Sequence, residues 1–177
     1  MSEQAMSEYG IVTEAGAVRF ERLLPGPIER VWAYLTDPDK RGTWLAAGPM
    51  DLRVGGQVEL NFHHADLSAE KTPPERYKKL EGGHTMQGRV TRCEPPRLLS
   101  YTWAEWGEVT FELTPRGDDV LLVLTHERAG AGMVSVAGGW HAHLGILADN
   151  LDGREPRPFW TTHTKAAAEY ERRMAAG

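Results

Sequence analysis

The chain has 177 residues, a net charge of −5 at pH 7 and one cysteine, Cys93. This length suits a single domain with one core, and the acidic balance gives no electrostatic reason to expect binding to nucleic acid or anionic membranes. A lone cysteine excludes an internal disulfide framework and a cysteine-based zinc site. No apolar run approaches the roughly 20 residues that span a bilayer, and the polar N-terminus lacks the regions of a signal peptide. We therefore expect a cytoplasmic protein without membrane insertion.

The first part of the chain predicts an arm, a strand and two helices. Residues 1–16 read as a flexible arm, and residues 17–177 as one domain. Residues 17–24 alternate, with Val18, Phe20 and Arg22 on one face, as a strand does. Pro27 is placed to open a helix, because its fixed φ and missing N–H suit a first turn. Asp37 is expected to cap a second short helix, which carries Trp44 and Leu45.

The middle of the chain predicts a hairpin, a long loop and further strands. Residues 51–62 read as two short strands joined at Gly55-Gly56, since glycines supply the positive φ angles of a tight turn. Residues 64–83 show no sustained period and form a long loop, with a helical turn near 75–80. Such a loop is either a lid over a site or disordered. Strands are then expected over 86–94, 98–105, 108–114 and 120–127, and the last is apolar enough to be covered on both faces.

Two helices complete the pattern. Six apolar residues, from Met133 to Leu151, recur at helical spacing before Gly153, a helix stop, and Asp149 falls on the opposite side. A final helix is expected from about Trp160 to Met174, with Phe159, His163, Ala166, Tyr170 and Met174 on one side. The order of elements predicts an α+β fold in which about six to seven curved antiparallel strands wrap around a long helix.

Five segments in this order resemble one known superfamily. They are PIERVWAYLTDPDKRGTWL, DLRVGGQVEL, GRVTRCEPPRLLSYTW, VTFELTPRGDDVLLVLTHE and GWHAHLGILADNLDG. The chain resembles the START-like, helix-grip superfamily (SRPBCC, birch-pollen-allergen-like), and within it the homologues of the activator of the heat-shock-protein-90 ATPase. The resemblance implies an apolar cavity between sheet and helix. It also implies lipids, sterols, polyketides or hormones as ligands, or cyclase or hydrolase activity in some members.

Histidines are the weak candidates for catalysis. His143 lies on the shoulder of the long helix, His126 near the end of the apolar strand and His63 at the end of an earlier strand. Imidazoles from separate elements could converge on a metal or act as acid and base. Each could equally be a hydrogen-bonded residue at the edge of the core. No metal-ligand spacing or catalytic motif supports the first reading, so no metal and no cofactor are expected.

Aromatic side chains are the candidates for ligand contact. Pockets for apolar ligands are lined mainly by such side chains, although the same rings could simply fill the core. The predicted ligand-binding residues are Trp44, Phe62, Trp103, Phe111, Trp140, His143 and Leu147.

Three functions remain open. The first is a carrier or sensor that binds a small hydrophobic molecule in the cavity. The second is a cyclase- or hydrolase-type enzyme that uses His143 or His126. The third is a protein-interaction or chaperone-regulating module. A homodimer is also expected, through a free sheet edge or the last helix.

Overall fold

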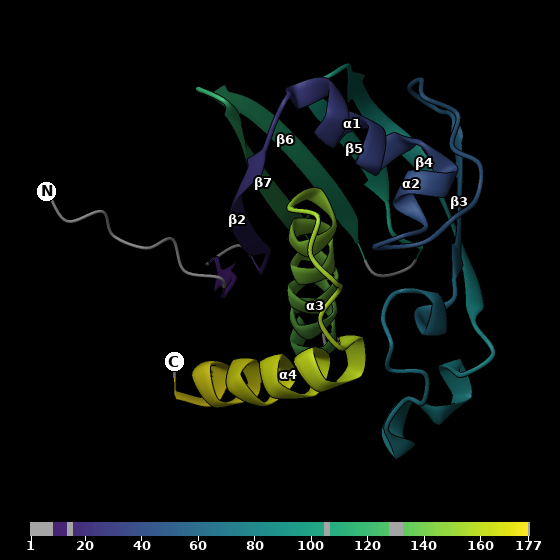
Figure 1. Ribbon diagram of the computed structural model, residues 1–177, viewed down its shortest axis with the longest axis vertical. Helices are drawn as coiled ribbons and strands as arrows, with labels where there is room; N and C mark the ends of the chain where they lie inside the picture. Colours follow the sequence, from purple (N-terminus) through teal and green to yellow (C-terminus); the bar gives the residue numbers. More distant parts are fainter. Residues whose placement is uncertain (1–8, 14–15, 105–106, 128–132, 177) are drawn as a thin grey trace, which may run out of the picture.

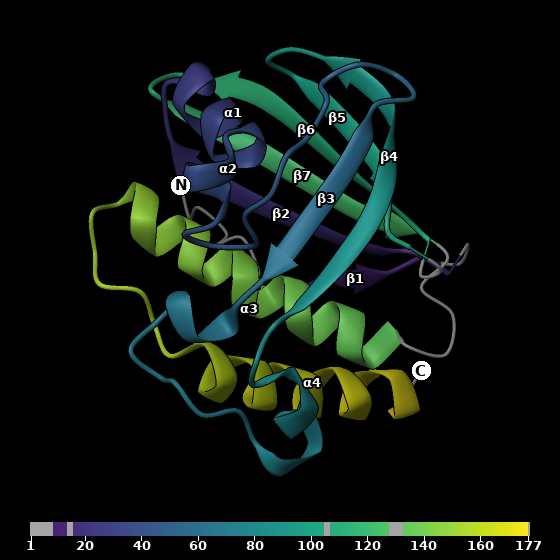
Figure 2. The ribbon, with the colours of Figure 1, turned by 90° about the vertical axis from the view of Figure 1, so that its right-hand side faces the viewer.

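The computed structural model describes residues 9–13, 16–104, 107–127 and 133–176. Within these ranges one antiparallel sheet has the strand order β1-β2-β7-β6-β5-β4-β3. The strands are β1 (Ile11–Val12), β2 (Val18–Pro25), β3 (Gln57–Phe62), β4 (His84–Glu94), β5 (Leu98–Thr102), β6 (Glu108–Arg116) and β7 (Asp119–Glu127). The sheet curves around one long helix (Figures 1 and 2), so the predicted α+β helix-grip fold is confirmed.

The helices form two groups. Helices α1 (Ile28–Thr36) and α2 (Pro38–Arg41) follow β2, and two 3-10 turns, η1 (His64–Asp66) and η2 (Glu75–Leu80), interrupt the long loop. Helix α3 (Met133–Leu151) crosses the concave face of the sheet, and α4 (Phe159–Ala176) runs on the side of α3 away from the sheet (Figure 2). Among the described residues, no helix is long and apolar enough to cross a membrane.

The predicted first strand and helix starts are confirmed. Val18, Phe20 and Arg22 are buried along β2, and α1 begins directly after Pro27. The Asp37 carboxylate accepts hydrogen bonds from two backbone N–H groups of α2, as expected of an N-cap. Trp44 and Leu45 lie beyond the end of this four-residue helix, where both are buried.

The predicted hairpin at Gly55-Gly56 is wrong. Residues 51–56 form successive turns, with Gly55 at φ +86°, and Met50 meets Val58 only in an isolated bridge. The Gly55 N–H donates to the carbonyl of Val90 on β4, which draws the segment to another strand. Strand β3 pairs along its whole length with β4, and its other edge meets the preceding residues in the isolated bridges Ala47–Asn61 and Met50–Val58.

The prediction that β7 is covered on both faces is also wrong. Its burial alternates: Val120, Leu122 and Leu124 are buried, whereas Leu121 and Val123 remain partly exposed. Helix α3 covers only the concave face, so the apolar residues of the other face contact water in part. The predicted strand over 98–105 ends at Thr102, and Glu105 lies outside the described residues.

Helix α3 is buried on two sides rather than one. Its apolar stripe faces the sheet as predicted, and Asp149, which was placed on the opposite side, is only 4% exposed. Arg157, in the connection to α4, donates from Nε and Nη2 to both Asp149 oxygens, each at 2.8 Å. Helix α4 approaches so closely that a Cβ added at Gly138 would stand 3.2 Å from the Cβ of Ala167. The sequence of α3 alone contained no sign of this second layer.

The loop over residues 64–83 is fastened to α4. The Ser68 hydroxyl accepts the backbone N–H of Phe159 at 3.1 Å, and the Glu70 carboxylate accepts the N–H and hydroxyl of Thr161, both at 2.7 Å. These two side chains satisfy N–H groups that a helix start leaves without intrahelical partners. The predicted helical turn near 75–80 is confirmed as η2.

The N-terminal segment is described in part. Ile11 and Val12 form β1 beside β2, and the Gly10 N–H donates to the Tyr170 hydroxyl of α4 at 2.6 Å. Residues 1–8 and 14–15 of the expected arm lie outside the described residues.

Candidate functional site

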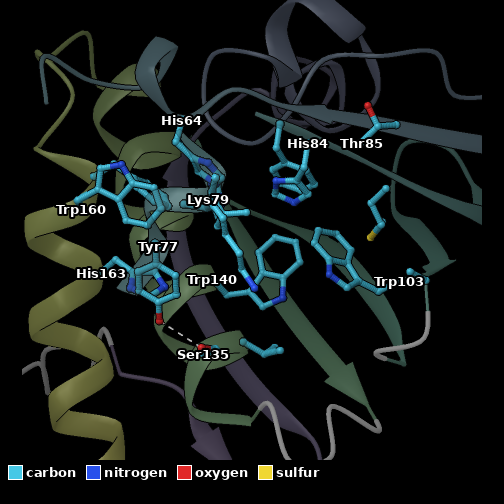
Figure 3. A pocket seen from close by; sticks show the side chains of 18 residues that line it. His64, Tyr77, Lys79, His84, Thr85, Trp103, Ser135, Trp140, Trp160 and His163 are labelled. Atoms are coloured by element: carbon cyan, nitrogen blue, oxygen red, sulfur yellow. Dashed lines mark hydrogen bonds between the residues drawn. The ribbon is translucent and has the colours of Figure 1, made fainter. Parts of the chain in front are cut away.

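A cavity of about 620 Å³ lies beside the first half of α3, between the end of the β3–β4 pair, the 64–83 loop and the start of α4 (Figure 3). Its lining comprises Phe62, His64, Tyr77, Lys79, Leu80, His84, Thr85, Met86, Trp103, Ala104, Ser135, Val136, Gly139, Trp140, His143, Phe159, Trp160 and His163. The volume lies within the roughly 300–1,000 Å³ range of small-molecule sites.

Rings dominate the lining. Phe62 and His84 stack with centroids 4.7 Å apart, and Trp103 lies 5.0 Å from Trp140. On the other side, Tyr77 stacks on Trp160 at 5.4 Å. The two aromatic groups therefore come from the sheet with α3 and from the loop with α4. Flat apolar walls of this kind suit a flat apolar guest.

Four histidines from four elements border the cavity. They are His64 of η1, His84 of β4, His143 of α3 and His163 of α4. The His64 ring is 5.9 Å from that of His84 and 5.8 Å from that of His143. His84 is exposed at the open side, whereas the other three are buried.

Burial keeps these imidazoles neutral at pH 7. It lowers the pKa of His64 to about 4 and that of His143 to about 3. Burial, with the positive charge of Arg76 nearby, lowers the pKa of His163 to about 4, and partial burial also lowers the pKa of His84. A low-dielectric surrounding disfavours the charged form of each ring.

The buried imidazoles differ in their hydrogen bonding. His143 Nδ1 is 2.8 Å from the Trp44 carbonyl oxygen; since that oxygen only accepts, Nδ1 donates. The Nδ1 atoms of His64 and His163 are buried and have no hydrogen-bond partner among the described residues. Natural proteins seldom leave such atoms unpaired, because each costs about 1–3 kcal/mol.

Charge is nearly absent from the lining. Lys79 is the one side chain of the Asp, Glu, Lys and Arg types among the lining residues, and it is exposed. No carboxylate borders the cavity within the described part of the chain, so a buried cation would find no counter-charge there.

The structure divides the predicted ligand-binding residues. Phe62, Trp103, Trp140 and His143 line the cavity. Trp44, Phe111 and Leu147 are buried outside its lining. The Trp44 N–H donates to the Tyr34 carbonyl at 2.7 Å, and Phe111 packs against Trp140. These three residues occupy filled core.

The other candidate histidines have partners of their own. His126 is fully buried, and its Nδ1 accepts the Trp140 N–H at 2.9 Å. His63 is exposed and lies 2.9 Å from the Asp66 carboxylate. The structure therefore does not bring His63, His126 and His143 together, and no group of three or more His, Cys, Asp or Glu side chains among the described residues could hold a metal ion.

Several lining residues were not among the predicted site residues. His64 and Tyr77 belong to the loop, which has no period that could assign a facing direction. His163 belongs to the apolar face predicted for the last helix. A polar residue on an apolar face faces the interior of the protein, so this position could have been predicted as a site residue. His84 lies just before the strand predicted over residues 86–94, so no alternation in the sequence indicated which way its side chain would face.

Comparisons with known proteins agree with this architecture. The family model described as Activator of Hsp90 ATPase homolog 1-like protein matches residues 25–152. The solution structure of the protein encoded by gene BPP1335 from Bordetella parapertussis is similar, with 47% identity over 98% of this chain and 95% of that chain and a TM-score of 0.81. No curated protein sequence matches this chain.

Two other solved structures share the fold. The crystal structure of CalU16 from Micromonospora echinospora has 26% identity, covers 92% of both chains and has a TM-score of 0.65. The Aha1 dimer from Colwellia psychrerythraea has 17% identity, covers 76% of this chain and 95% of that chain, and has a TM-score of 0.56. The second likeness is one of fold alone.

Proposed function

Because the chain belongs to the Activator of Hsp90 ATPase homolog 1-like family, whose fold encloses a cavity between sheet and helix, we propose that it binds a small hydrophobic molecule there, as a carrier or sensor. The cavity of about 620 Å³ carries this proposal, since ten of its eighteen lining residues have rings and the exposed Lys79 is the one charged side chain among these eighteen. An apolar cavity of this size favours a guest over water.

The expected affinity follows from area. A guest that buries about 400 Å² of apolar surface gains about 10 kcal/mol at about 25 cal/mol per Å². Association costs at least about 4 kcal/mol in lost translational and rotational freedom. The difference is at most about 6 kcal/mol, which corresponds to a dissociation constant of about 40 μM or weaker.

Acid–base catalysis is less well supported than binding. His126 is outside the lining, and its Nδ1 already accepts a hydrogen bond from Trp140. His143 borders the cavity, but burial lowers its pKa to about 3, far from the value near 7 that suits a general acid or base. We therefore give the two histidines packing and orienting roles.

Native mass spectrometry of freshly purified protein, followed by analysis of the released small molecules, tests this function. Gly139 offers a matched pair of variants, because a Cβ added there meets no atom within 4 Å and the residue lines the cavity. Gly139→Ala leaves room for a guest, whereas Gly139→Leu occupies part of it. We expect a lipophilic adduct on wild type and Gly139→Ala and a much weaker one on Gly139→Leu. If Gly139→Ala and Gly139→Leu carry the adduct in equal amounts, the molecule binds at a site other than this cavity.

The same spectrum reports the oligomeric state. A homodimer remains a prediction, for which the dimer of the Colwellia psychrerythraea protein is the available parallel.

The cytoplasm likewise remains the predicted location of the protein.

A further inference from the structure

We infer that the contact between the 64–83 loop and α4 is sensitive to protons: His64 and His163 bind protons when the loop leaves α4, so acid opens the cavity and releases its guest. This inference rests on the proposed binding function and adds a means of regulation to it. It starts from two histidines that are only 7% and 5% exposed and that lie at this contact.

Each side of the contact contributes one imidazole. His64 belongs to the loop and packs on two rings of α4, with its centroid 4.9 Å from that of Phe159 and 5.0 Å from that of Trp160. His163 belongs to α4 and meets Tyr77 of the loop edge-to-face at 4.9 Å (Figure 3). Movement of the loop away from α4 would therefore uncover both imidazoles together.

The contact closes off one nitrogen of each ring. Nδ1 of His64 and Nδ1 of His163 are buried and have no hydrogen-bond partner among the described residues. A protonated imidazole donates from both ring nitrogens, so each Nδ1 would carry a buried proton without an acceptor. Burial of such a charge is costly, whereas water can solvate it once the loop has moved. Protonation therefore favours the open loop, and a guest does not have to touch either nitrogen.

The charged groups around the two rings strengthen this response. The side chains that act on them electrostatically, besides the two rings themselves, are His63, His84 of β4 and Arg76 of the loop. All three are bases, so positive charge accumulates at the contact as the pH falls.

The other titratable groups nearby have partners of their own. From α3, His143 lies 5.8 Å from His64 and donates from Nδ1 to the Trp44 carbonyl oxygen. Of the loop carboxylates, Asp66 lies 2.9 Å from His63, and Glu70 accepts from Thr161. These carboxylates are engaged and do not offset a charge on the buried rings.

The loop is fastened by few polar contacts. Ser68 and Glu70 bind N–H groups at the start of α4, and the Tyr77 hydroxyl lies 3.2 Å from that of Ser135. The two unpaired nitrogens act against these contacts, because a buried polar atom without a partner weakens the closed arrangement. Segments held by such small differences open locally while the core stays folded.

The size of the response follows from the pKa values. Burial lowers the pKa of His64 to about 4, and burial with the charge of Arg76 lowers that of His163 to about 4. A solvated imidazole has a pKa near 6.5. The open loop thus binds protons more tightly, so opening increases as the pH falls from 6.5 to 4 and levels off below 4. Between pH 7 and 5 each ring should increase the open population about twentyfold.

Hydrogen exchange followed by NMR tests the opening without a guest. The Phe159 and Thr161 amides report on it, because their N–H groups bind Ser68 and Glu70 of the loop. We expect their protection factors, corrected for the intrinsic pH dependence of exchange, to fall at least about a hundredfold between pH 7 and 5. Amides of residues 144–151 in α3 should stay at least about tenfold more protected at pH 5. Equal protection of the two sets would mean that the loop does not open by itself, and the inference would be overturned.

Leucine variants test the assignment to the two rings. Leucine binds no proton, so His64→Leu and His163→Leu should each retain a fall of about twentyfold, and the double variant almost none. Each variant also removes an unpaired nitrogen, so the loop should open less than in wild type at pH 7, whereas loss of a merely structural histidine would loosen it. His63→Gln is the matched control, because His63 is exposed and adjacent in sequence, and it should behave as wild type. A full pH response in the double variant would assign the response to another group, such as Glu70, and overturn the inference.

Release of a guest is measured by stopped-flow fluorescence with N-phenyl-1-naphthylamine, an apolar probe that is uncharged between pH 7 and 5. We expect release from wild type to be at least about tenfold faster at pH 5 than at pH 7, and release from the double leucine variant to be the same at both. If release from wild type does not change while the Phe159 amide loses protection, the loop does not control the cavity, and the inference is overturned while the binding function stands.

Failure of the binding function has a different signature. If wild type neither binds the probe nor carries an adduct in native mass spectrometry, the proposed function fails, and release of a guest fails with it. The Phe159 and Thr161 amides still decide whether acid opens the loop.

Discussion

The two halves of α3 pass through different surroundings. From Leu144 onward most of the helix is buried, and Leu144, Ile146 and Leu147 have no exposed surface. Before that point, Val136, Gly139, Trp140 and His143 border the cavity. We call these the filled half and the hollow half. The filled half fixes the helix against the sheet and α4, and the hollow half can then remain open without collapse.

The largest expected effect is in the filled half, at the Asp149–Arg157 pair. Asp149→Ala leaves the Arg157 guanidinium without its two 2.8 Å partners. Asp149 is buried, but the Arg157 side chain is 30% exposed and can be rehydrated, so we expect a loss of about 2 kcal/mol. Urea denaturation should report this loss. Asp152→Ala, which breaks the exposed contact to Arg154, is the control and should cost less than about 1 kcal/mol. Equal losses of stability in the two variants would mean that the burial of Asp149 does not strengthen its contribution to stability.

The next prediction compares two neighbouring glycines. Gly138→Ala forces a Cβ to 3.2 Å from Ala167, so α4 must shift and we expect a loss of about 1–2 kcal/mol. Gly139→Ala points a methyl group into open space and should instead stabilise the helix by about 0.5–1 kcal/mol. Thermal unfolding of the two variants measures both signs. If the two substitutions change the stability in the same direction, the distinction between a packed environment at Gly138 and an open one at Gly139 is wrong.

Acid should destabilise the protein through the buried histidines that border the cavity. In the folded protein burial lowers the pKa of His64 and His163 to about 4, whereas the unfolded values are near 6.5. Protons then bind the unfolded chain first, so stability is complete above pH 6.5 and falls between pH 6.5 and 4. The loss is on the order of 1 kcal/mol per pH unit for each ring. Unfolding free energies at pH 7 and 5 should show the fall, and His163→Leu should reduce it.

Asp149 gives the contrasting pH response. Burial acts to raise its pKa, but the hydrogen bonds and charge of Arg157 outweigh burial and lower it. Its contribution to stability is present above its unfolded pKa near 4 and is lost only as the pH falls through the lower folded value. A pH slope between 7 and 5 that disappeared in Asp149→Ala would therefore contradict the assignment of that slope to the imidazoles.

The smallest effect is expected where the loop meets α3. The Tyr77 hydroxyl and the Ser135 hydroxyl are 3.2 Å apart at the surface. Tyr77→Phe removes this contact and keeps the stacking on Trp160, so global stability should change by less than about 0.5 kcal/mol. Hydrogen exchange of residues 64–83 should nevertheless become faster. Unchanged exchange would show that Ser68 and Glu70 alone fasten the loop.

The sequence predicted the frame better than the site. The spacing from Met133 to Leu151, the Asp37 cap and the alternation at Val18, Phe20 and Arg22 are local patterns, and the structure confirms them. These patterns depend on residues close in the chain, which is why they can be read without the fold.

Local sequence patterns could not predict which part of the core is filled and which part encloses the cavity. Trp44 and Trp103 are the same residue type in similar apolar contexts, yet only Trp103 lines the cavity. His64 reaches the site because Ser68 and Glu70 attach its loop to α4, about 90 residues further along the chain. Contacts of that range leave no periodicity in either segment.

The position of α4 in the chain has a consequence for biosynthesis. Phe159, Trp160 and His163 form the last wall of the cavity to leave the ribosome, after the sheet and α3. Until that wall docks, Phe62 and Trp140 face water on a nascent chain, and exposed apolar surface of this kind promotes aggregation. We therefore expect the nascent protein to need protection from aggregation until α4 has docked and covered this side of the cavity.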